Sequence, residues 1–182
     1  TTRAALHAAA KRLAEGVRYR SAGTVEFIYD AEKDKFYFLE VNTRLQVEHG
    51  VTEAVFGVDL VRWMVELAAG MKPFDPAMEW IPKGHAMEFR LYAEDPAKNY
   101  RPSSGLITEA TFPEEARIDT WVARGTEVSA FYDPLLAKII VHGNDRAETL
   151  KKAKSALAKT RLYGFETNLE LLKDVLEMPE FA

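Results

Sequence analysis

The sequence predicts an α+β fold, in which antiparallel strands and helices occupy separate stretches of the chain. Three observations favour this class. Two strand-like runs near the N-terminus are separated by a short charged segment, which is typical of an antiparallel hairpin. A Pro-containing stretch at residues 71–84 is followed by four further strand-like runs. Two helices with capping patterns then close the chain.

The first half of the chain is expected to hold two helices and the hairpin. The elements are expected at residues 2–15 (helix), 23–30 and 36–42 (strands) and 60–69 (helix). Gly16 is expected to end the first helix and Gly70 the second, because glycine favours the left-handed backbone of a helix end. Asp59 is expected to cap the second helix at its start.

A subdomain boundary is expected near residue 75, where the composition shifts. The strand-like runs beyond it lie at residues 85–94, 105–112, 117–122 and 134–142. Asp145 with Glu148, and Thr167 with Glu170, have the spacing of capping boxes and predict the starts of the two closing helices.

Composition excludes several classes of protein. The 182 residues include 47% hydrophobic residues, which supports a packed core, and the net charge of -4 with scattered Lys and Arg argues against nucleic-acid binding. The lack of cysteine excludes disulfides and fits a reducing, cytoplasmic location. No apolar run approaches the ~20 residues that span a bilayer, and no signal peptide precedes the first helix. The first residue is not Met, so a fragment of a longer protein is expected.

Polar side chains recur at every second position from residue 40, near the end of the hairpin's second strand, to residue 48. They are Glu40, Asn42, Arg44, Gln46 and Glu48. Extended backbone has a side-chain period of two, so all five are expected on one side of the chain. One row then carries two anions, a cation and two amides, which suits a site that holds a metal, an oxyanion and a proton acceptor.

The hairpin predicts a metal site. A turn that places Asp30 opposite Phe36 also places Glu26 opposite Glu40, because antiparallel partners keep a constant index sum. Two carboxylates ~5 Å apart repel by roughly 1–3 kcal/mol, so a cation is expected between them. Together with Asn42 they offer only hard oxygen ligands, which suits Mg²⁺ and argues against zinc. The alternatives are two solvated glutamates or one neutral glutamate.

The second half of the row predicts an oxyanion site. Arg44 has a planar fork suited to a carboxylate-like or phosphate-like oxyanion, and Gln46 can donate an amide hydrogen bond to the same ligand. Glu48 could accept a proton from that ligand. The alternative is a surface ion pair between Arg44 and Glu48, worth ~0–1 kcal/mol.

These residues carry a resemblance to a known family. The runs 26–28 and 38–49 resemble the signature of biotin carboxylases, which are ATP-grasp enzymes; the Asn-x-Arg-x-Gln-Val-Glu-His part is specific to biotin-dependent carboxylases. The resemblance continues through Gly84-His85-Ala86, Arg90 to Pro96 and Tyr132 to Lys138, and it covers essentially the whole chain. The runs 117–122 and 125–135 are most similar to the urea carboxylase branch, which includes urea amidolyases.

The resemblance implies a domain division and a reaction. Residues 1–75 would be the C-terminal portion of an ATP-grasp domain, and residues 76–182 a biotin carboxylase C-terminal domain. Such an ATP-dependent ligase carboxylates carrier-bound biotin with ATP and bicarbonate, through carboxyphosphate. The resemblance implies Mg²⁺ or Mn²⁺ bridging the ATP phosphates and biotin carried on another domain.

The resemblance also implies a role for each matching residue. The metal would be held by Glu26, Glu40 and Asn42. Bicarbonate would be bound by Arg44, Gln46 and the backbone of Val47, and Glu48 would remove its proton.

Two further positions are implied near the cofactors. Arg90, with Arg44, would stabilise the biotin enolate, and Ile28 would pack near the nucleotide. From the residues alone, Arg90 could equally form an ion pair with Glu88 or Glu94, and Ile28 could be a plain core residue.

The implied partners lie outside these residues. They are a biotin carboxyl carrier domain, a carboxyltransferase domain that selects the final acceptor, the N-terminal half of the biotin carboxylase and a second copy in a homodimer. The ten glycines of the chain are nowhere closer than seven positions, so no Gly-rich phosphate loop is expected here and the chain alone is expected to be inactive. The alternatives are a non-catalytic folding or dimerisation module, or an ATP-grasp carboxylase of the acyl-CoA or pyruvate type.

Overall fold

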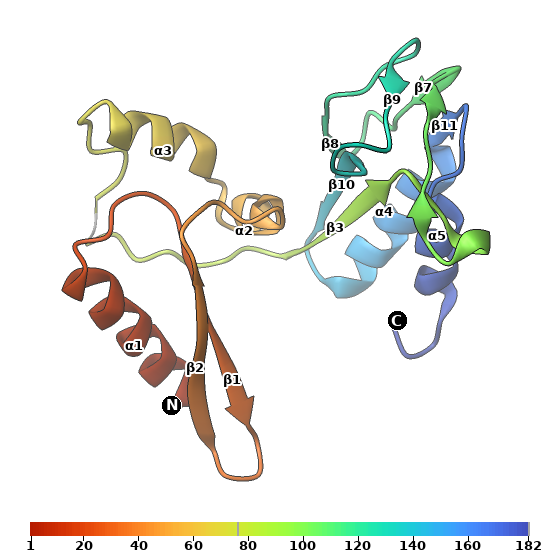
Figure 1. Ribbon diagram of the computed structural model, residues 1–182. Helices are drawn as coiled ribbons and strands as arrows, with labels where there is room; N and C mark the ends of the chain where they lie inside the picture. Colours follow the sequence, from red (N-terminus) through yellow and green to blue (C-terminus); the bar gives the residue numbers. More distant parts are fainter. Residues whose placement is uncertain (76, 182) are drawn as a thin grey trace. The chain divides into compact units, whose positions relative to one another are not determined.

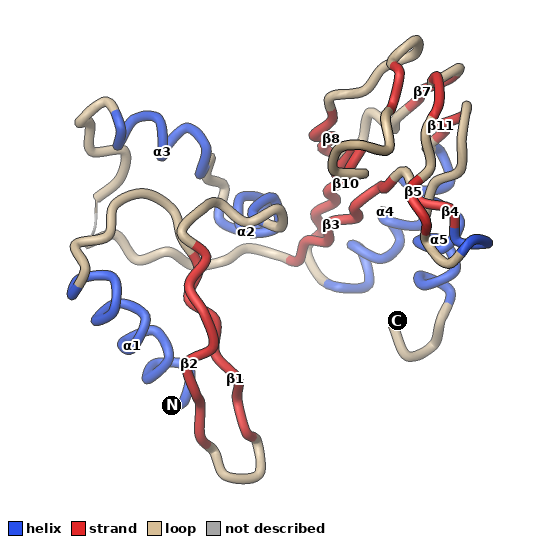
Figure 2. Tube along the Cα trace, in the orientation of Figure 1, coloured by secondary structure: helices blue, strands red, loops and turns tan. Residues whose placement is uncertain are grey.

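The computed structural model describes residues 1–75 and 77–181, and the chain divides into two compact units. Unit 1 comprises Thr1–His49 and Val58–Glu79, and unit 2 comprises Gly50–Gly57 and Trp80–Ala182. The segment between the two parts of unit 1 therefore packs with unit 2. The α+β class is confirmed, with antiparallel strand pairs and helices in separate stretches (Figures 1 and 2).

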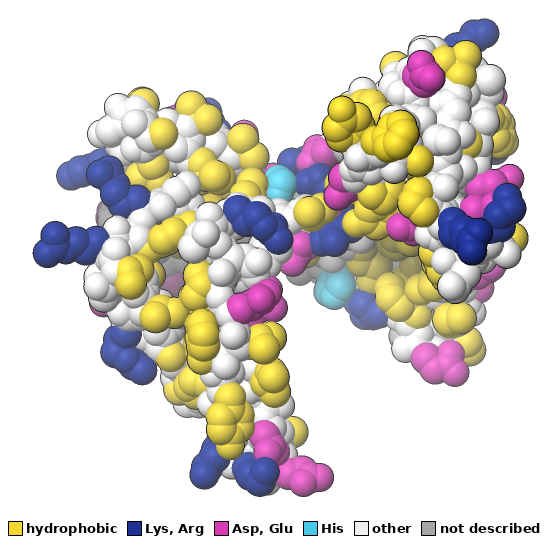
Figure 3. All heavy atoms as spheres, in the orientation of Figure 1, with side chains coloured by type: hydrophobic (Ala, Val, Ile, Leu, Met, Phe, Trp, Pro, Cys, Tyr) yellow, Lys and Arg dark blue, Asp and Glu magenta, His cyan; other side chains and the backbone are white. Residues whose placement is uncertain are grey.

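Unit 1 is built from a hairpin and helices. Its elements are α1 (Thr2–Gly16), β1 (Thr24–Asp30), β2 (Lys35–Asn42) and α3 (Leu60–Ala68). The apolar side chains of the hairpin remain in part exposed, as Figure 3 shows along its length; the exposed ones include Ile28, Tyr37, Phe38 and Leu39. Phe27 packs edge-on against Phe36, with 5.4 Å between ring centroids.

The register of the hairpin changes along its length. At the turn Asp30 pairs with Lys35, so the expected pairing of Asp30 with Phe36 is wrong. A β-bulge between Glu26 and Phe27 shifts the register, and Leu39 is the additional residue on β2. Beyond the bulge Glu26 pairs with Glu40, as predicted. The bulge thus compensates for a turn that is one residue tighter than expected.

Both helices of unit 1 form where they were predicted. The cap at Asp59 is confirmed, since its Oδ1 accepts a hydrogen bond from the Arg62 backbone N–H at 2.8 Å. Helix α1 ends at Gly16, as predicted, but Gly16 does not supply the left-handed backbone, which comes at Arg18 with φ of 52°. Gly70 has φ of 79° just after α3, in agreement with its predicted role.

Helix α2 (His49–Phe56) was not predicted. It begins directly after Glu48, at the last residue of the first segment of unit 1, and continues into the segment Gly50–Gly57 of unit 2. Gly50 and Glu53 are its buried residues. None of the described helices is long and apolar enough to cross a membrane.

Unit 2 contains the core of the described chain. Its central sheet has the order β3-β10-β8, and all its pairings are antiparallel. The strands are β3 (His85–Tyr92), β4 (Glu94–Asp95), β5 (Arg101–Pro102), β6 (Gly105–Leu106), β7 (Glu109–Thr111), β8 (Arg117–Thr120), β9 (Glu127–Val128), β10 (Leu135–Gly143) and β11 (Arg161–Tyr163). Each of the predicted strand runs is therefore occupied, although two of them are split into shorter strands. A 3₁₀ turn, η1 (Pro96–Lys98), follows β4.

Helices α4 (Arg146–Lys159) and α5 (Leu169–Glu177) complete unit 2. The core residues of the sheet and α4 include Leu91, Leu136, Ile139 and Leu157, each fully buried. Asp145 accepts from the Glu148 N–H at 2.8 Å, so the cap of α4 is confirmed. The capping box predicted at Thr167 is wrong, because Asn168 is the residue at the N-cap of α5. Its side chain instead donates to the Arg90 carbonyl and accepts from the Tyr92 N–H.

Candidate functional site

Two carboxylates of the hairpin meet at one amide in unit 1. Glu26 on β1 and Glu40 on β2 are direct partners in the ladder. Asn42 Nδ2 donates to Glu26 Oε1 at 2.8 Å and to Glu40 Oε1 at 3.2 Å. The bulge at Leu39 creates this register, and the three predicted metal-ligand residues therefore converge.

The predicted oxyanion residues join the same cluster. Gln46 Nε2 donates to Glu26 Oε1 at 3.2 Å, and Arg44 Nη1 donates to Gln46 Oε1 at 3.4 Å. Arg44 Nη1 also lies 3.3 Å from the Leu45 carbonyl oxygen. A continuous series of hydrogen bonds thus runs from Glu40 through Asn42, Glu26 and Gln46 to Arg44.

The backbone of the row differs from the prediction. Strand β2 ends at Asn42, and a bend at Arg44 and a turn at residues 47–48 then lead into α2. The prediction of extended backbone to Glu48 is therefore wrong. The side chains of Arg44 and Gln46 nevertheless reach the acid pair, because the chain curves back after the strand and Gln46 bonds across to β1.

The donor set fits a hard divalent cation. Glu26, Glu40 and Asn42 carry oxygen atoms, and two like charges face one another in a ladder pair, which is destabilising without a cation. The Asn42 amide also has an oxygen, and a half-turn about its Cβ–Cγ bond exchanges it with Nδ2. Among the described residues no group of three or more His, Cys, Asp and Glu could hold a metal, so an amide must complete any ligand set here.

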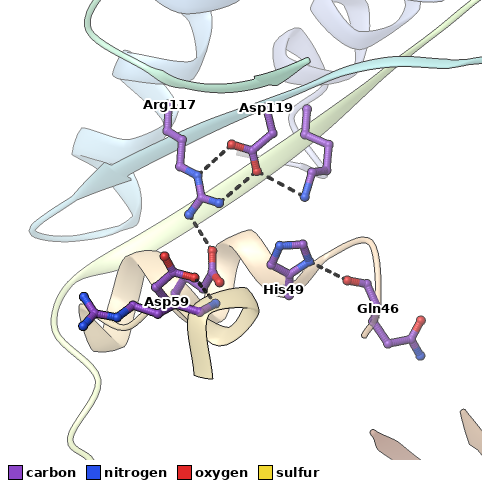
Figure 4. A network of polar contacts seen from close by, with 8 residues as sticks. Gln46, His49, Asp59, Arg117 and Asp119 are labelled. Atoms are coloured by element: carbon purple, nitrogen blue, oxygen red, sulfur yellow. Dashed lines mark hydrogen bonds and ion pairs between the residues drawn. The ribbon is translucent and has the colours of Figure 1, made fainter. Parts of the chain in front are cut away.

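Glu48 and Val47 occupy the turn before α2. Glu48 is exposed and Val47 is half-buried. The turn is closed by His49, whose backbone N–H and Nδ1 both lie within hydrogen-bond distance of the Gln46 carbonyl, at 3.3 and 2.7 Å (Figure 4). Because a carbonyl oxygen only accepts, Nδ1 of His49 carries the proton in this arrangement.

The two remaining candidates lie apart from this cluster in the chain. Ile28 is on β1 two residues after Glu26, on the same face of the strand, and it is 55% exposed. Arg90 belongs to unit 2, on β3, where Nε lies 3.5 Å from Glu88 Oε1. The ion pair with Glu88, one of the two alternatives considered for Arg90, is therefore present.

Unit 2 holds a charge network that the sequence interpretation missed. Arg117 on β8 bonds Glu53 on α2 and Asp119 on its own strand, and Lys138 on β10 contacts Asp119 at 3.3 Å (Figure 4). Partial burial acts to raise the pKa of Asp119, but the hydrogen bonds and charges of Arg117 and Lys138 outweigh it and leave that pKa below its ordinary value. The pKa of Arg117 is raised, chiefly by its hydrogen bonds to Asp119. The sequence did contain a signal for this network: Arg117 and Asp119 are two positions apart, and so lie on the same face of a predicted strand.

Comparison with known protein families gives two matches. Residues 88–182 match the family model of the biotin carboxylase C-terminal domain. The chain belongs to this family. Residues 1–73 match the ATP-binding domain of the carbamoyl-phosphate synthase L chain. Both matches agree with the predicted resemblance.

Individual relatives of this biotin carboxylase family member agree. The chain is 54% identical to urea amidolyase of Saccharomyces cerevisiae over 100% of its own length, and it covers 10% of that protein. The crystal structure of Kluyveromyces lactis urea carboxylase superposes with a TM-score of 0.93 at 52% identity, over 99% of this chain and 16% of that one. The chain thus spans about a tenth of the curated relative's length.

A third relative is less similar. The biotin carboxylase domain of Hydrogenobacter thermophilus 2-oxoglutarate carboxylase, a dimer in complex with MgADP, ADP and bicarbonate, has a TM-score of 0.85 at 37% identity, over 92% of this chain and 37% of that one. The greater identity to urea amidolyase and urea carboxylase confirms the predicted similarity to that branch.

Proposed function

We propose that this chain supplies the metal- and bicarbonate-binding part of the active site of a biotin carboxylase, within a urea carboxylase. The observation that carries the proposal is the convergence of Glu26, Glu40, Asn42, Gln46 and Arg44 through four side-chain hydrogen bonds of 2.8–3.4 Å. The family match and the identity to urea amidolyase support the same assignment. The reaction would carboxylate biotin on a carrier domain, using ATP and bicarbonate.

The hairpin acids would bind the magnesium of MgATP. Glu26 and Glu40 would each contribute a carboxylate oxygen and Asn42 its amide oxygen, and Mn²⁺ is the other cation that this hard-oxygen set suits. When bound, the metal would neutralise phosphate charge and so favour attack at the γ-phosphate. Ile28, on the same strand face as Glu26, would contact the nucleotide.

The segment after the hairpin would bind and activate bicarbonate. The Arg44 guanidinium and the Gln46 amide would hold its oxygens, together with the Val47 backbone. Glu48, which precedes α2, would accept the bicarbonate proton, so that the resulting carbonate oxygen can form a bond to the γ-phosphorus as ADP leaves. The product of that step is carboxyphosphate. Arg44 and Arg90 would then stabilise negative charge on biotin.

The proposal extends to domains and partners. Residues 1–75 would form the C-terminal portion of an ATP-grasp domain, and residues 76–182 the biotin carboxylase C-terminal domain. The two family matches, at residues 1–73 and 88–182, support this division. The carrier, the carboxyltransferase and the remaining part of the biotin carboxylase would act with it in the cytoplasm, and the C-terminal domain would form a homodimer.

The test is the Glu48→Gln variant of the complete natural polypeptide. Because Gln cannot accept the bicarbonate proton, we expect kcat for biotin-stimulated ATP cleavage to fall about 100-fold or more. Phosphate release is measured with and without bicarbonate. The matched control is Glu32→Gln in the hairpin turn, which is exposed and expected to keep the parent rate. Parent-level kcat in the Glu48→Gln variant would contradict the proposal.

A further inference from the structure

Arg117 connects two elements of unit 2 with all three of its guanidinium nitrogens. Nη1 donates to Glu53 Oε2 on α2 at 2.6 Å, while Nε and Nη2 donate to the two oxygens of Asp119 at 2.9 Å each. Lys138 Nζ lies 3.3 Å from Asp119 Oδ2. This charge network, Glu53, Arg117, Asp119 and Lys138, therefore joins α2 to β8 and β10 (Figure 4).

The network includes two nearly buried charges. The Glu53 side chain is 3% exposed and the Lys138 side chain 10%. Apolar residues of similar size would pack at such positions with comparable or greater stability, so buried ion pairs are weak sources of stability. Their directed hydrogen bonds do, however, fix one arrangement of the elements that they join. The fork of Arg117 thus defines the place of Glu53, and with it the position of α2 on the sheet.

Two other contacts hold α2 at the same place. Gly50 lies so close to the sheet that a Cβ there would be 2.9 Å from Glu88 Oε2 and would also meet Ile140. The Lys83 N–H donates to the Val55 carbonyl at 2.7 Å. The helix is therefore held near its start by packing, at its middle by charge and near its end by a backbone hydrogen bond.

The candidate bicarbonate residues directly precede this helix. His49 is the first residue of α2, and its N–H and Nδ1 both contact the Gln46 carbonyl. The side chain of Gln46 in turn donates to Glu26. Val47 and Glu48 therefore lie inside a closed turn whose last residue, His49, is also the first residue of α2.

We propose that Arg117 is a positioning residue, which holds α2 through Glu53 and so fixes the Gln46–Glu48 turn for bicarbonate. The inference rests on the proposed function. It assigns to Arg117 an effect on bicarbonate binding without contact to the substrate.

The test is Arg117→Lys in the complete natural polypeptide. Lysine keeps the charge but has a single nitrogen, so it cannot bond Glu53 and both oxygens of Asp119 together. We expect the KM for bicarbonate to rise about tenfold or more, because the bicarbonate-binding groups would be misplaced. The KM for MgATP should change less than about twofold. The matched control, Arg62→Lys, alters the exposed Arg62–Glu66 pair on α3 and is expected to leave both KM values unchanged.

A merely structural role predicts a different result. Loss of folded protein lowers the amount of active enzyme and thus the apparent kcat, but it leaves both KM values unchanged. Unchanged KM for bicarbonate in Arg117→Lys would therefore overturn the inference. Glu53→Gln provides a second measurement. Its amide oxygen can still accept from Arg117, so we expect this variant to fold and to show a smaller rise in the KM for bicarbonate, of about threefold. No rise in Glu53→Gln would also overturn it.

The two proposals fail in different ways. If Glu48→Gln keeps its activity, the proposed function fails, whatever Arg117→Lys shows. If Glu48→Gln is inactive and Arg117→Lys binds bicarbonate as the parent does, only the positioning role fails.

Discussion

The carboxylates of this chain show two different electrostatic environments. Asp119 has two cationic partners within 3.3 Å, which favour its charged form. Glu26 and Glu40 face each other across the hairpin and share an uncharged amide. Removing one member of a paired charge network leaves its partners unpaired and is destabilising, whereas a pair of like charges held together is suited to bind a cation.

The environment of Asp119 predicts acid sensitivity of unit 2. Because the pKa of Asp119 is lower folded than unfolded, its contribution to stability is fully present above the unfolded pKa of about 3.9. That contribution is lost as the pH falls through the lower, folded pKa. We expect Asp119→Asn to lower the free energy of unfolding at pH 7 by about 1–2 kcal/mol, a value that allows for the partial exposure of Asp119. Below about pH 4 the free energy of unfolding of the variant should fall less steeply with pH than that of the parent.

Urea unfolding of both proteins from pH 7 to pH 2, followed by circular dichroism, measures this difference. The exposed Glu114, substituted by Gln, is the control and should behave as the parent. Parallel pH curves for Asp119→Asn and the parent would show that the network does not favour the charged form.

At the scale of the element, the short helix α2 directly follows the candidate bicarbonate residues in the chain and packs within unit 2. Two of its residues are buried, Gly50 against β3 and β10 and Glu53 against Arg117. A helix of 8 residues is not stable in isolation, so tertiary contacts must maintain it. Changes at its contact face should therefore be more costly than the same changes on another helix.

Gly50→Ala is the corresponding prediction. The added methyl would lie within 3 Å of buried side-chain atoms, and we expect it to lower the free energy of unfolding by about 1–3 kcal/mol despite the better helix propensity of alanine. Gly16→Ala in α1 is the control, since nothing lies within 4 Å of its Cβ position, and it should be neutral or stabilising by up to about 1 kcal/mol. Thermal melting compares the two; equal effects would mean that α2 does not pack closely on the sheet.

The sequence predicted correctly those elements that depend on residues close together in the chain. The caps at Asp59 and Asp145, the hairpin and the strand-rich second half all formed where side-chain pattern required. The bulge at Leu39 and helix α2 were missed because their causes are not local. A bulge depends on the register of both strands, which one strand's sequence does not determine. Helix α2 follows residues 40–48, whose alternating polar side chains are also typical of a strand. The predicted cluster around Glu26 forms even though the backbone after Asn42 is not extended, because the side chains of Asn42 and Gln46 both donate to Glu26.

At the scale of the whole molecule, packing is unevenly distributed between the units. All buried hydrophobic residues identified in the described chain lie in unit 2, from Ala86 onward. Helices α1 and α3 of unit 1 contain no fully buried residue in the described structure. The candidate metal and bicarbonate residues belong to unit 1, so their geometry is supported by few buried contacts.

We therefore expect the 182-residue chain alone to show no ATP cleavage. It lacks closely spaced glycines that could cradle phosphates, and the candidate site lies on the less packed unit. The measurement is phosphate release with MgATP, bicarbonate and free biotin, beside the complete natural polypeptide as positive control. Cleavage that depends on bicarbonate and biotin in the isolated chain would refute this expectation.

The Leu39 bulge separates the tip of the hairpin from its acid pair. An insertion at the tip would lie in the loop between Asp30 and Lys35. The pairing of Glu26 with Glu40 lies beyond the bulge, away from this loop. An epitope or fluorescent reporter grafted into residues 31–34 should thus leave the geometry of Glu26 and Glu40 intact, which makes this loop a suitable attachment point for a label.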